Sequence, residues 1–462
     1  MLSREIQSLI DLARNQNNNG HAKIISLLSE VESLDFKGLF NHLYNNSQTY
    51  SWSKPNENTS FITNGVLFSI EENGPNRLLS SQSILDKASF THINNFEDFK
   101  FVDIPLFFGG IKFSPESGKE PWENFADSDW FIPETLFIKK DEKYYICENF
   151  LFSGFSQEIF EIRAQNSADV TNKFSQFYDN EGVSFSNISD DDTAEWNLLV
   201  ANALKEIENG EFSKIVLSRK VMLKSSSDIN ISAWLFALGL RYPRCYVFAY
   251  KKGNSIFFGA TPEKLAVIHN RIIEADALAG SIPRGNSEQE DVKLADELLL
   301  NKKNCAEHRA VVDFIVESFD SFADEIEYPV KPVIKKLKNI QHLWTPIKGS
   351  FKSESDIFLM LKSIHPTPAI CGTPWRKALE GIIKKESFNR GFFTGVIGWF
   401  NLEKEGEFAV GIRSALLKDR ILYGYAGCGI VEGSDPEEEY HETMLKLKPI
   451  LSLTEYEKVS QS

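Results

Sequence analysis

Residues 245–278 read CYVFAYKKGNSIFFGATPEKLAVIHNRIIEADAL and contain strand-forming runs that follow one another with no helix between them. Val, Ile, Phe and Tyr dominate these runs, and turn residues such as Gly253 and Asn254 separate them. Glu263 follows Thr-Pro at what reads as a sharp turn between two strands. This stretch therefore favours long antiparallel strands.

The flanking sequence agrees with that interpretation. Residues 1–190 contain strand-like segments separated by turn clusters, for example WFIPETLFIKKDEKYYICENF at 130–150. We expect helices from Asp192 or Thr193 to Gly210, over roughly 287–320, near 354–363, and from Pro436 onward. Helices segregated from antiparallel strands predict an α+β fold. We place a sequence boundary between a strand-rich part, 1–190, and a second part, 191–455.

The composition limits the function classes. Acidic residues outnumber basic ones by 65 to 50, giving a formal charge of −15, which argues against a nucleic-acid partner. There is no secretory h-region and no run of 18 apolar residues, so no membrane partner is expected. The five cysteines are scattered without a CxxC pair, which is typical of reduced thiols in a cytoplasmic protein.

The segment GEFSKIVLSRK, residues 210–220, places a lysine at the start of an apolar strand. Lys214 shares a face with Val216 if successive side chains alternate. The residue is then either a solvated charge at a strand end or an amine held in a cleft. The strand by itself does not distinguish these alternatives.

The last expected helix, SDPEEEYHETMLKLKP, carries acidic residues on one face. Asp435 is a good N-cap, and Glu439, Glu442 and Lys446 fall at i, i+3 and i+7. One interpretation is a solvated face with a Glu442–Lys446 pair. The other is a carboxylate pair for a hard divalent cation beside an ammonium for an anionic ligand.

Three further places could carry chemistry. Glu307, in NKKNCAEHRAVV, lies on the helix face most suited to turn inward, where a carboxylate needs a partner or a metal. Arg413 interrupts an apolar strand in AVGIRSALL and requires either an internal acid or a ligand carboxylate. Gly427 and Gly429 follow a strand. They either form a turn or leave backbone N–H groups bare so that these can bind an anion. The turn residue Glu263 is a fourth such place, either a solvated residue or a catalytic acid.

Eight ordered motifs between about Thr193 and Leu453 together resemble the chorismate-utilising enzymes, which include anthranilate, aminodeoxychorismate, isochorismate and salicylate synthases. The motifs are GEFSKIVLSR, FFGATPEKL, EADALAGSIPRG, NKKNCAEH, IHPTPAICGTP, RGFFTGVIGW, VGIRSA and AGCGIVEGSDPEEEYHET. The N-terminal part resembles the longer, menaquinone-type isochorismate synthases, notably in FFGGIKFSPESGKEPWENF.

This resemblance implies large antiparallel sheets packed as a sandwich with helices outside, a catalytic part over residues 191–455, and roles for individual residues. Mg²⁺ is expected to bridge protein carboxylates and the ring carboxylate of chorismate, with Glu307 and Glu442 as ligands and Glu439 close by. The positions that match substrate-binding residues are Gly280, Ser281, His365, Ala369, Arg413, Gly427, Gly429 and Lys446.

Three positions distinguish members of the family. Ammonia-using members carry Gln at the position of Lys214, so a lysine here implies a general base that activates water, with Glu263 as the acid for the departing C4 hydroxyl. Ala279 stands where aminodeoxychorismate synthases have a nucleophilic lysine. Ala369 stands where the members that release pyruvate usually show Thr.

The resemblance therefore implies an isochorismate synthase that depends on Mg²⁺ and feeds menaquinone synthesis. The alternatives are a salicylate synthase, a siderophore-pathway isochorismate synthase, and a non-catalytic chorismate-binding protein. We expect no glutaminase subunit, and a monomer or weak homodimer.

Overall fold

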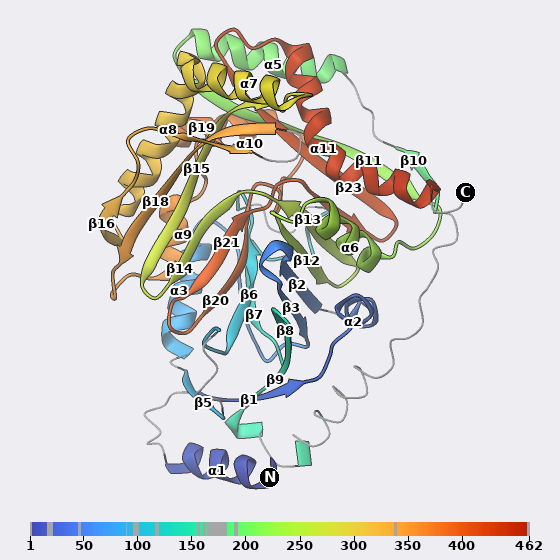
Figure 1. The fold of residues 1–462 in the computed structure, drawn as a ribbon, viewed down its shortest axis with the longest axis vertical. Coiled ribbons are helices and arrows are strands. Elements are labelled where there is room, and N and C mark those ends of the chain that lie inside the picture. Colours follow the sequence, from blue (N-terminus) through green and yellow to red (C-terminus); the bar gives the residue numbers. More distant parts are fainter. Residues whose placement is uncertain are drawn as a thin grey trace.

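Two large sheets face each other, and helices cover their outer surfaces (Figure 1). The structure is a computed structural model that describes residues 2–15, 22–44, 48–88, 90–95, 101–115, 120–154, 158–159, 163, 183–188, 193–336 and 340–459. The α+β class predicted from the sequence is confirmed. No helix among these residues is long and apolar enough to cross a membrane.

The first sheet has thirteen strands within the described ranges. Their order is β10 (Phe185–Asn187), β11 (Lys214–Ser225), β23 (Ile421–Val431), β22 (Ser414–Lys418), β13 (Ser255–Thr261), β12 (Tyr246–Lys252), β2 (Gln48–Lys54), β3 (Thr59–Asn64), β8 (Thr135–Lys140), β9 (Lys143–Leu151), β1 (Lys23–Val31) and β5 (Thr91–Asn94), with β19 (Gly372–Thr373) on β11. All neighbours are antiparallel except β1 and β5, which are parallel.

The second sheet has ten strands, again counting described residues. Their order is β16 (Ala323–Glu327), β18 (Ile340–Phe351), β15 (Ile272–Pro283), β14 (Lys264–His269), β21 (Gly406–Val410), β20 (Val396–Asn401), β6 (Leu106–Ile111), β7 (Ser128–Ile132) and β4 (Phe68–Glu72), with β17 (Val333–Lys336) on β18. Strands from before and after residue 190 share both sheets.

An aromatic core fills the space between the sheets. Tyr50 of the first sheet contacts Phe108 of the second, with ring centroids 5.5 Å apart, and Tyr250 stacks on Phe131 at 6.0 Å. These rings are fully buried. Alternating side chains place one face of each strand in this core and the other against helices.

The helices lie on the outer faces and at one end of the sandwich (Figure 1). They are α1 (Leu2–Asn15), α2 (Phe36–Leu43), α3 (Arg77–Ala88), α5 (Thr193–Glu208), α6 (Ile231–Arg241), α7 (Glu288–Leu300), α8 (Lys302–Phe319), α9 (Ile357–Ile364), α10 (Trp375–Lys385) and α11 (Pro436–Val459). Helices α3, α8 and α9 cover the second sheet, whereas α2, α6 and α11 cover the first.

Helices α1, α2, α3, α6 and α10 were not expected from the sequence, and one expected helix is divided. The single helix expected over 287–320 is two helices, because Asn301 takes an extended conformation and its side chain accepts the backbone N–H of Asn304. Asn301 thus ends α7 and caps α8. Helix α11 begins at Pro436 as expected, with Asp435 accepting the N–H groups of Glu437 and Glu438. Asp192, the alternative cap of α5, lies outside the described residues.

Candidate active site

The chain crosses from one sheet to the other at two adjacent places, and a cavity opens there. One crossing joins β13 to β14 through Glu263, and the other joins β21 to β22 through Arg413. Backbone hydrogen bonds hold them together: Val410 N–H donates to Glu263 O at 3.1 Å, and Ala260 N–H donates to Arg413 O at 3.2 Å. A sheet crossover exposes polar side chains at the end of the aromatic core, which suits a binding site.

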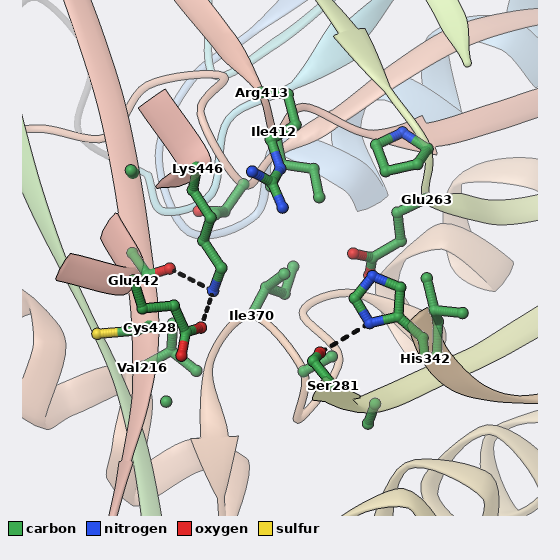
Figure 2. Close-up of a pocket in the computed structure, with 18 of the residues that line it drawn as sticks. Val216, Glu263, Ser281, His342, Ile370, Ile412, Arg413, Cys428, Glu442 and Lys446 are labelled. Carbon is green, nitrogen blue, oxygen red and sulfur yellow. Dashed lines mark hydrogen bonds and ion pairs between the residues drawn. The ribbon is translucent and has the colours of Figure 1, made fainter. Parts of the chain in front are cut away.

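The cavity has a volume of about 150 Å³ and receives side chains from both sheets, α8 and α11. Eleven of the thirteen predicted site residues line it, namely Lys214, Glu263, Gly280, Ser281, Glu307, Ala369, Arg413, Gly427, Gly429, Glu442 and Lys446. Figure 2 shows Lys446 and Glu442 on one side of this space, with Glu263 and His342 on the other. In the described part of the chain, no residue before Lys214 reaches it.

Lys214 is a buried side chain at the start of β11, not a solvated charge. Its side chain is only 9% exposed, and its ammonium forms an ion pair with Glu307 of α8. Gly429 lies opposite Val216 on β23, and a Cβ there would come within 2.6 Å of the Lys214 side chain. Gly429 is therefore needed to make room for the lysine.

The carboxyl group of Glu263 has a pKa shifted toward neutral pH. Burial of its carboxyl group raises its pKa to about 7, and the nearby ammonium groups of Lys446 and Lys214 oppose that rise. Thr261 holds the turn by accepting the N–H of Glu263 and donating to the carbonyl of Val410. The carboxyl can thus carry a proton at pH 7 while facing the cavity.

The glycines of β23 present backbone groups to the cavity. Gly427 O accepts a hydrogen bond from Lys446 Nζ at 2.8 Å, so the backbone of this residue faces away from β11. Gly429, two residues on, has the same orientation. Strand β22 pairs with β23 only up to Gly424. It therefore does not cover the backbone of Gly427 and Gly429 on the side away from β11. The two glycines lie within the strand rather than after it, which corrects the sequence interpretation of a turn.

Two carboxylates could hold a divalent cation. Glu307 and Glu442 enter the same cavity from α8 and α11. Each is paired with an ammonium, Glu307 with Lys214 and Glu442 with Lys446 at 2.6 Å. The described residues contain no cluster of three or more His, Cys, Asp or Glu side chains around one point. Two carboxylate oxygens with water and substrate oxygens nevertheless form a set of ligands that suits Mg²⁺.

Two predicted site residues lie outside the cavity wall. The Glu439 carboxylate accepts a hydrogen bond from Ser434 at 2.8 Å. His365, which we expected to contact substrate, hydrogen-bonds through Nε2 to Thr394 O at 2.8 Å, and burial lowers the pKa of its ring to about 4. The His365 ring therefore supports the cavity wall at Thr394.

Arg390 supports the same wall from behind. Its guanidinium donates to the carbonyl groups of Val216 at 2.8 Å and Ile370 at 3.2 Å, and to the hydroxyl of Thr394 at 3.3 Å. All three of these residues line the cavity. The counter-ion of Arg390 is Glu386. Both side chains are buried, each only 2% exposed. This pair connects β11 with two loops.

His342 is a cavity residue that the sequence interpretation missed. It lies on β18, opposite Ser281 of β15, and Nδ1 is 2.7 Å from Ser281 Oγ. Burial, with Arg413 and Lys446 nearby, lowers the pKa of the ring to about 3, so the ring is neutral. Apolar and polar residues partly alternate in IQHLWTPIKG, and this pattern could have indicated the strand. Pro346 in its interior, however, argues against a strand.

The chorismate binding enzyme family matches residues 8–455. The chain belongs to this family. The resemblance inferred from its motifs is thereby confirmed.

Similar chorismate-binding enzymes include isochorismate synthases. The chain is 32% identical over 441 residues to isochorismate synthase MenF of Bacillus subtilis, covering 94% of this chain and 93% of the relative. It is 32% identical over 349 residues to the salicylate biosynthesis isochorismate synthase of Pseudomonas aeruginosa, covering 74% and 73%. The solved structure of the menaquinone-specific isochorismate synthase MenF of Escherichia coli superposes with a TM-score of 0.77 at 22% identity, covering 98% and 99%, which shows the shared fold.

Proposed function

We propose that this chorismate-binding enzyme is an isochorismate synthase that converts chorismate to isochorismate. The observation that carries the proposal is that a basic group and an acidic group line the same cavity. Lys214 reaches it from the start of β11, and Glu263 from the crossing between β13 and β14. The similarity to isochorismate synthases over 94% of the chain supports the same reaction.

The proposed chemistry adds one water and removes another. Lys214 takes a proton from a water molecule, whose oxygen bonds to ring C2 while the ring double bonds shift. The C4–O bond breaks, and the leaving oxygen takes the proton of Glu263 and departs as water. The Lys214 ammonium that pairs with Glu307 has no lone pair for this step, so the reactive state requires Lys214 as the neutral amine, with Glu307 engaged elsewhere.

We infer that Arg413, the backbone of Gly427 and Gly429, and Lys446 hold the substrate carboxylates. Within the described residues the Arg413 guanidinium forms no ion pair, so it is available to a ligand. Gly280, Ser281 and Ala369 shape the wall around the ring. Ala279 provides no nucleophile, so this mechanism has no covalent intermediate at that position.

Glu307 and Glu442 are the proposed Mg²⁺ ligands, with Glu439 close to them through water. When bound, the cation would neutralise the ring carboxylate and orient the ring. The reaction transfers no nitrogen, so we propose that the chain works without a glutaminase subunit. We also propose that it works in the cytoplasm, as a monomer or weak homodimer, for menaquinone synthesis.

Chromatography of the products tests the reaction. Purified protein, chorismate and Mg²⁺ are expected to give isochorismate alone in a short assay. Salicylate with an equal amount of pyruvate, made at a rate proportional to enzyme, would instead assign a salicylate synthase. No product at all would leave a chorismate-binding protein without this activity.

Glu442→Gln tests the metal site. This change keeps the side-chain size but removes a charged oxygen, so we expect activity to fall on the order of 10–100-fold and the Mg²⁺ concentration for half-activation to rise. Titrating Mg²⁺ against activity and against the thermal midpoint measures both effects. The matched control is Glu438→Gln, an exposed residue of the same helix. Wild-type Mg²⁺ dependence in Glu442→Gln would refute the assignment.

A further inference from the structure

A second cavity adjoins the catalytic one. Its volume is about 610 Å³, and Pro262 and Arg413 line both cavities. Its other walls come from the loop between α6 and β12, the end of β15, β17, the start of β18 and Pro449 of α11. The two spaces therefore lie on either side of the crossing that carries Arg413.

The wall of the second cavity is strongly basic. Its cationic residues are Arg241, Arg244, Arg284, Lys336 and Arg413. Among the residues that the structure describes, no aspartate or glutamate lines it. A concentration of positive charge is unexpected in a chain with a formal charge of −15.

Some of this charge is compensated from behind the wall. Asp291 pairs with Arg284 at 2.6 Å and with Lys336 at 2.7 Å, so one carboxylate serves two cations. Arg244 is exposed and, within the described ranges, forms no ion pair. The cavity thus keeps a net positive charge.

The remaining lining residues are mostly apolar. Leu240, Tyr242, Ile340 and Pro449 contribute to the wall. A cavity with an apolar lining and several cations suits a small organic anion rather than a bare inorganic ion. Charged walls around a recess also raise the local concentration of an oppositely charged ligand.

We propose that this basic cavity is a docking site where the dicarboxylate substrate binds before it passes Arg413 into the catalytic cavity. This proposal rests on the proposed function, because chorismate is the dicarboxylate that the catalytic cavity would accept. Arg413 contacts both spaces, so it can hold a carboxylate on either side of the crossing. Arg244 lines the basic cavity but not the catalytic cavity.

Arg244→Glu tests the docking site in the steady state. At low ionic strength kcat/KM for chorismate is expected to fall roughly three- to tenfold with kcat unchanged, and the difference should shrink in 0.5 M salt as the charges are screened. The matched control is Arg14→Glu, which makes the same change of net charge on exposed α1. An equal loss in both variants, or a loss confined to kcat, would overturn the proposal.

Cys245 gives a readout that does not depend on turnover. This free thiol lines the basic cavity, and burial raises its pKa to about 11, so its alkylation by neutral iodoacetamide is followed at pH 9 by mass spectrometry. Chorismate without Mg²⁺ is expected to slow alkylation in the wild type but not in Arg244→Glu. Cys305, on α8 outside both cavities, is the internal control.

The two failures are distinguishable. Protection of Cys245 by chorismate in a protein that makes no isochorismate would refute the proposed function and keep the docking site. Production of isochorismate with no protection, or with equal protection in Arg244→Glu, would refute the docking site alone.

Discussion

Lys214→Ala is expected to abolish water addition while the protein stays folded. The mutation removes the only basic amine at the start of β11 that faces the cavity, and loss of a general base costs on the order of 10²–10⁴-fold in turnover. Product formation is measured by chromatography, and folding by circular dichroism. Because the lysine lies at the end of a strand and pairs with the partly exposed Glu307, we expect little change in the fold.

Two companion variants sharpen this experiment. Lys224→Ala, at an exposed position of the same strand, should keep wild-type turnover. Lys214→Gln places here the residue that ammonia-using relatives carry, and it should also fail to add water. Turnover near the wild-type rate in Lys214→Ala would remove the base assignment.

Glu263→Gln is expected to remove the acid and, with it, the alkaline limb of the pH profile. The active form of an acid is protonated, and the pKa of about 7 keeps that form populated up to neutral pH. With the ordinary pKa of 4.5, only roughly one carboxyl in 300 would be protonated at pH 7. Wild-type kcat/KM should therefore decline as pH rises above about 7, and Glu263→Gln should lose on the order of 10²–10⁴-fold in rate.

The measurement is kcat/KM between pH 5.5 and 9 for the wild type and two variants. Glu263→Asp keeps a carboxyl group one methylene shorter, so it should retain a declining limb at reduced rate. An unchanged alkaline limb in Glu263→Gln would show that another group donates the proton.

Local sequence patterns were enough to predict much of this molecule. Strand-forming runs joined by turns, such as residues 245–278, predicted antiparallel sheets because period-two alternation and turn residues act over a few positions. Asp435 and Pro436 predicted the start of α11 for the same local reason. The family motifs, which are also contiguous, located the residues that line the cavity.

Other features depend on contacts between distant segments. Lys214 and Glu307 are 93 positions apart, and only the packing of α8 against the sheets brings them into an ion pair. His342 was missed because its strand contains a proline. The motif around His365 does not say on which side of the cavity wall its ring lies. The raised pKa of Glu263 likewise comes from desolvation by many neighbours.

The sequence by itself thus determined the fold class, the family and most of the predicted residues that line the cavity, because these follow from local pattern and contiguous motifs. Only the tertiary structure decided that Lys214 is buried and paired, that Glu263 and Arg413 lie at the two crossings between sheets, and that a basic cavity adjoins the one lined by these residues. Burial, pairing and cavity shape are sums over residues far apart in the chain, so no short stretch of sequence specifies them.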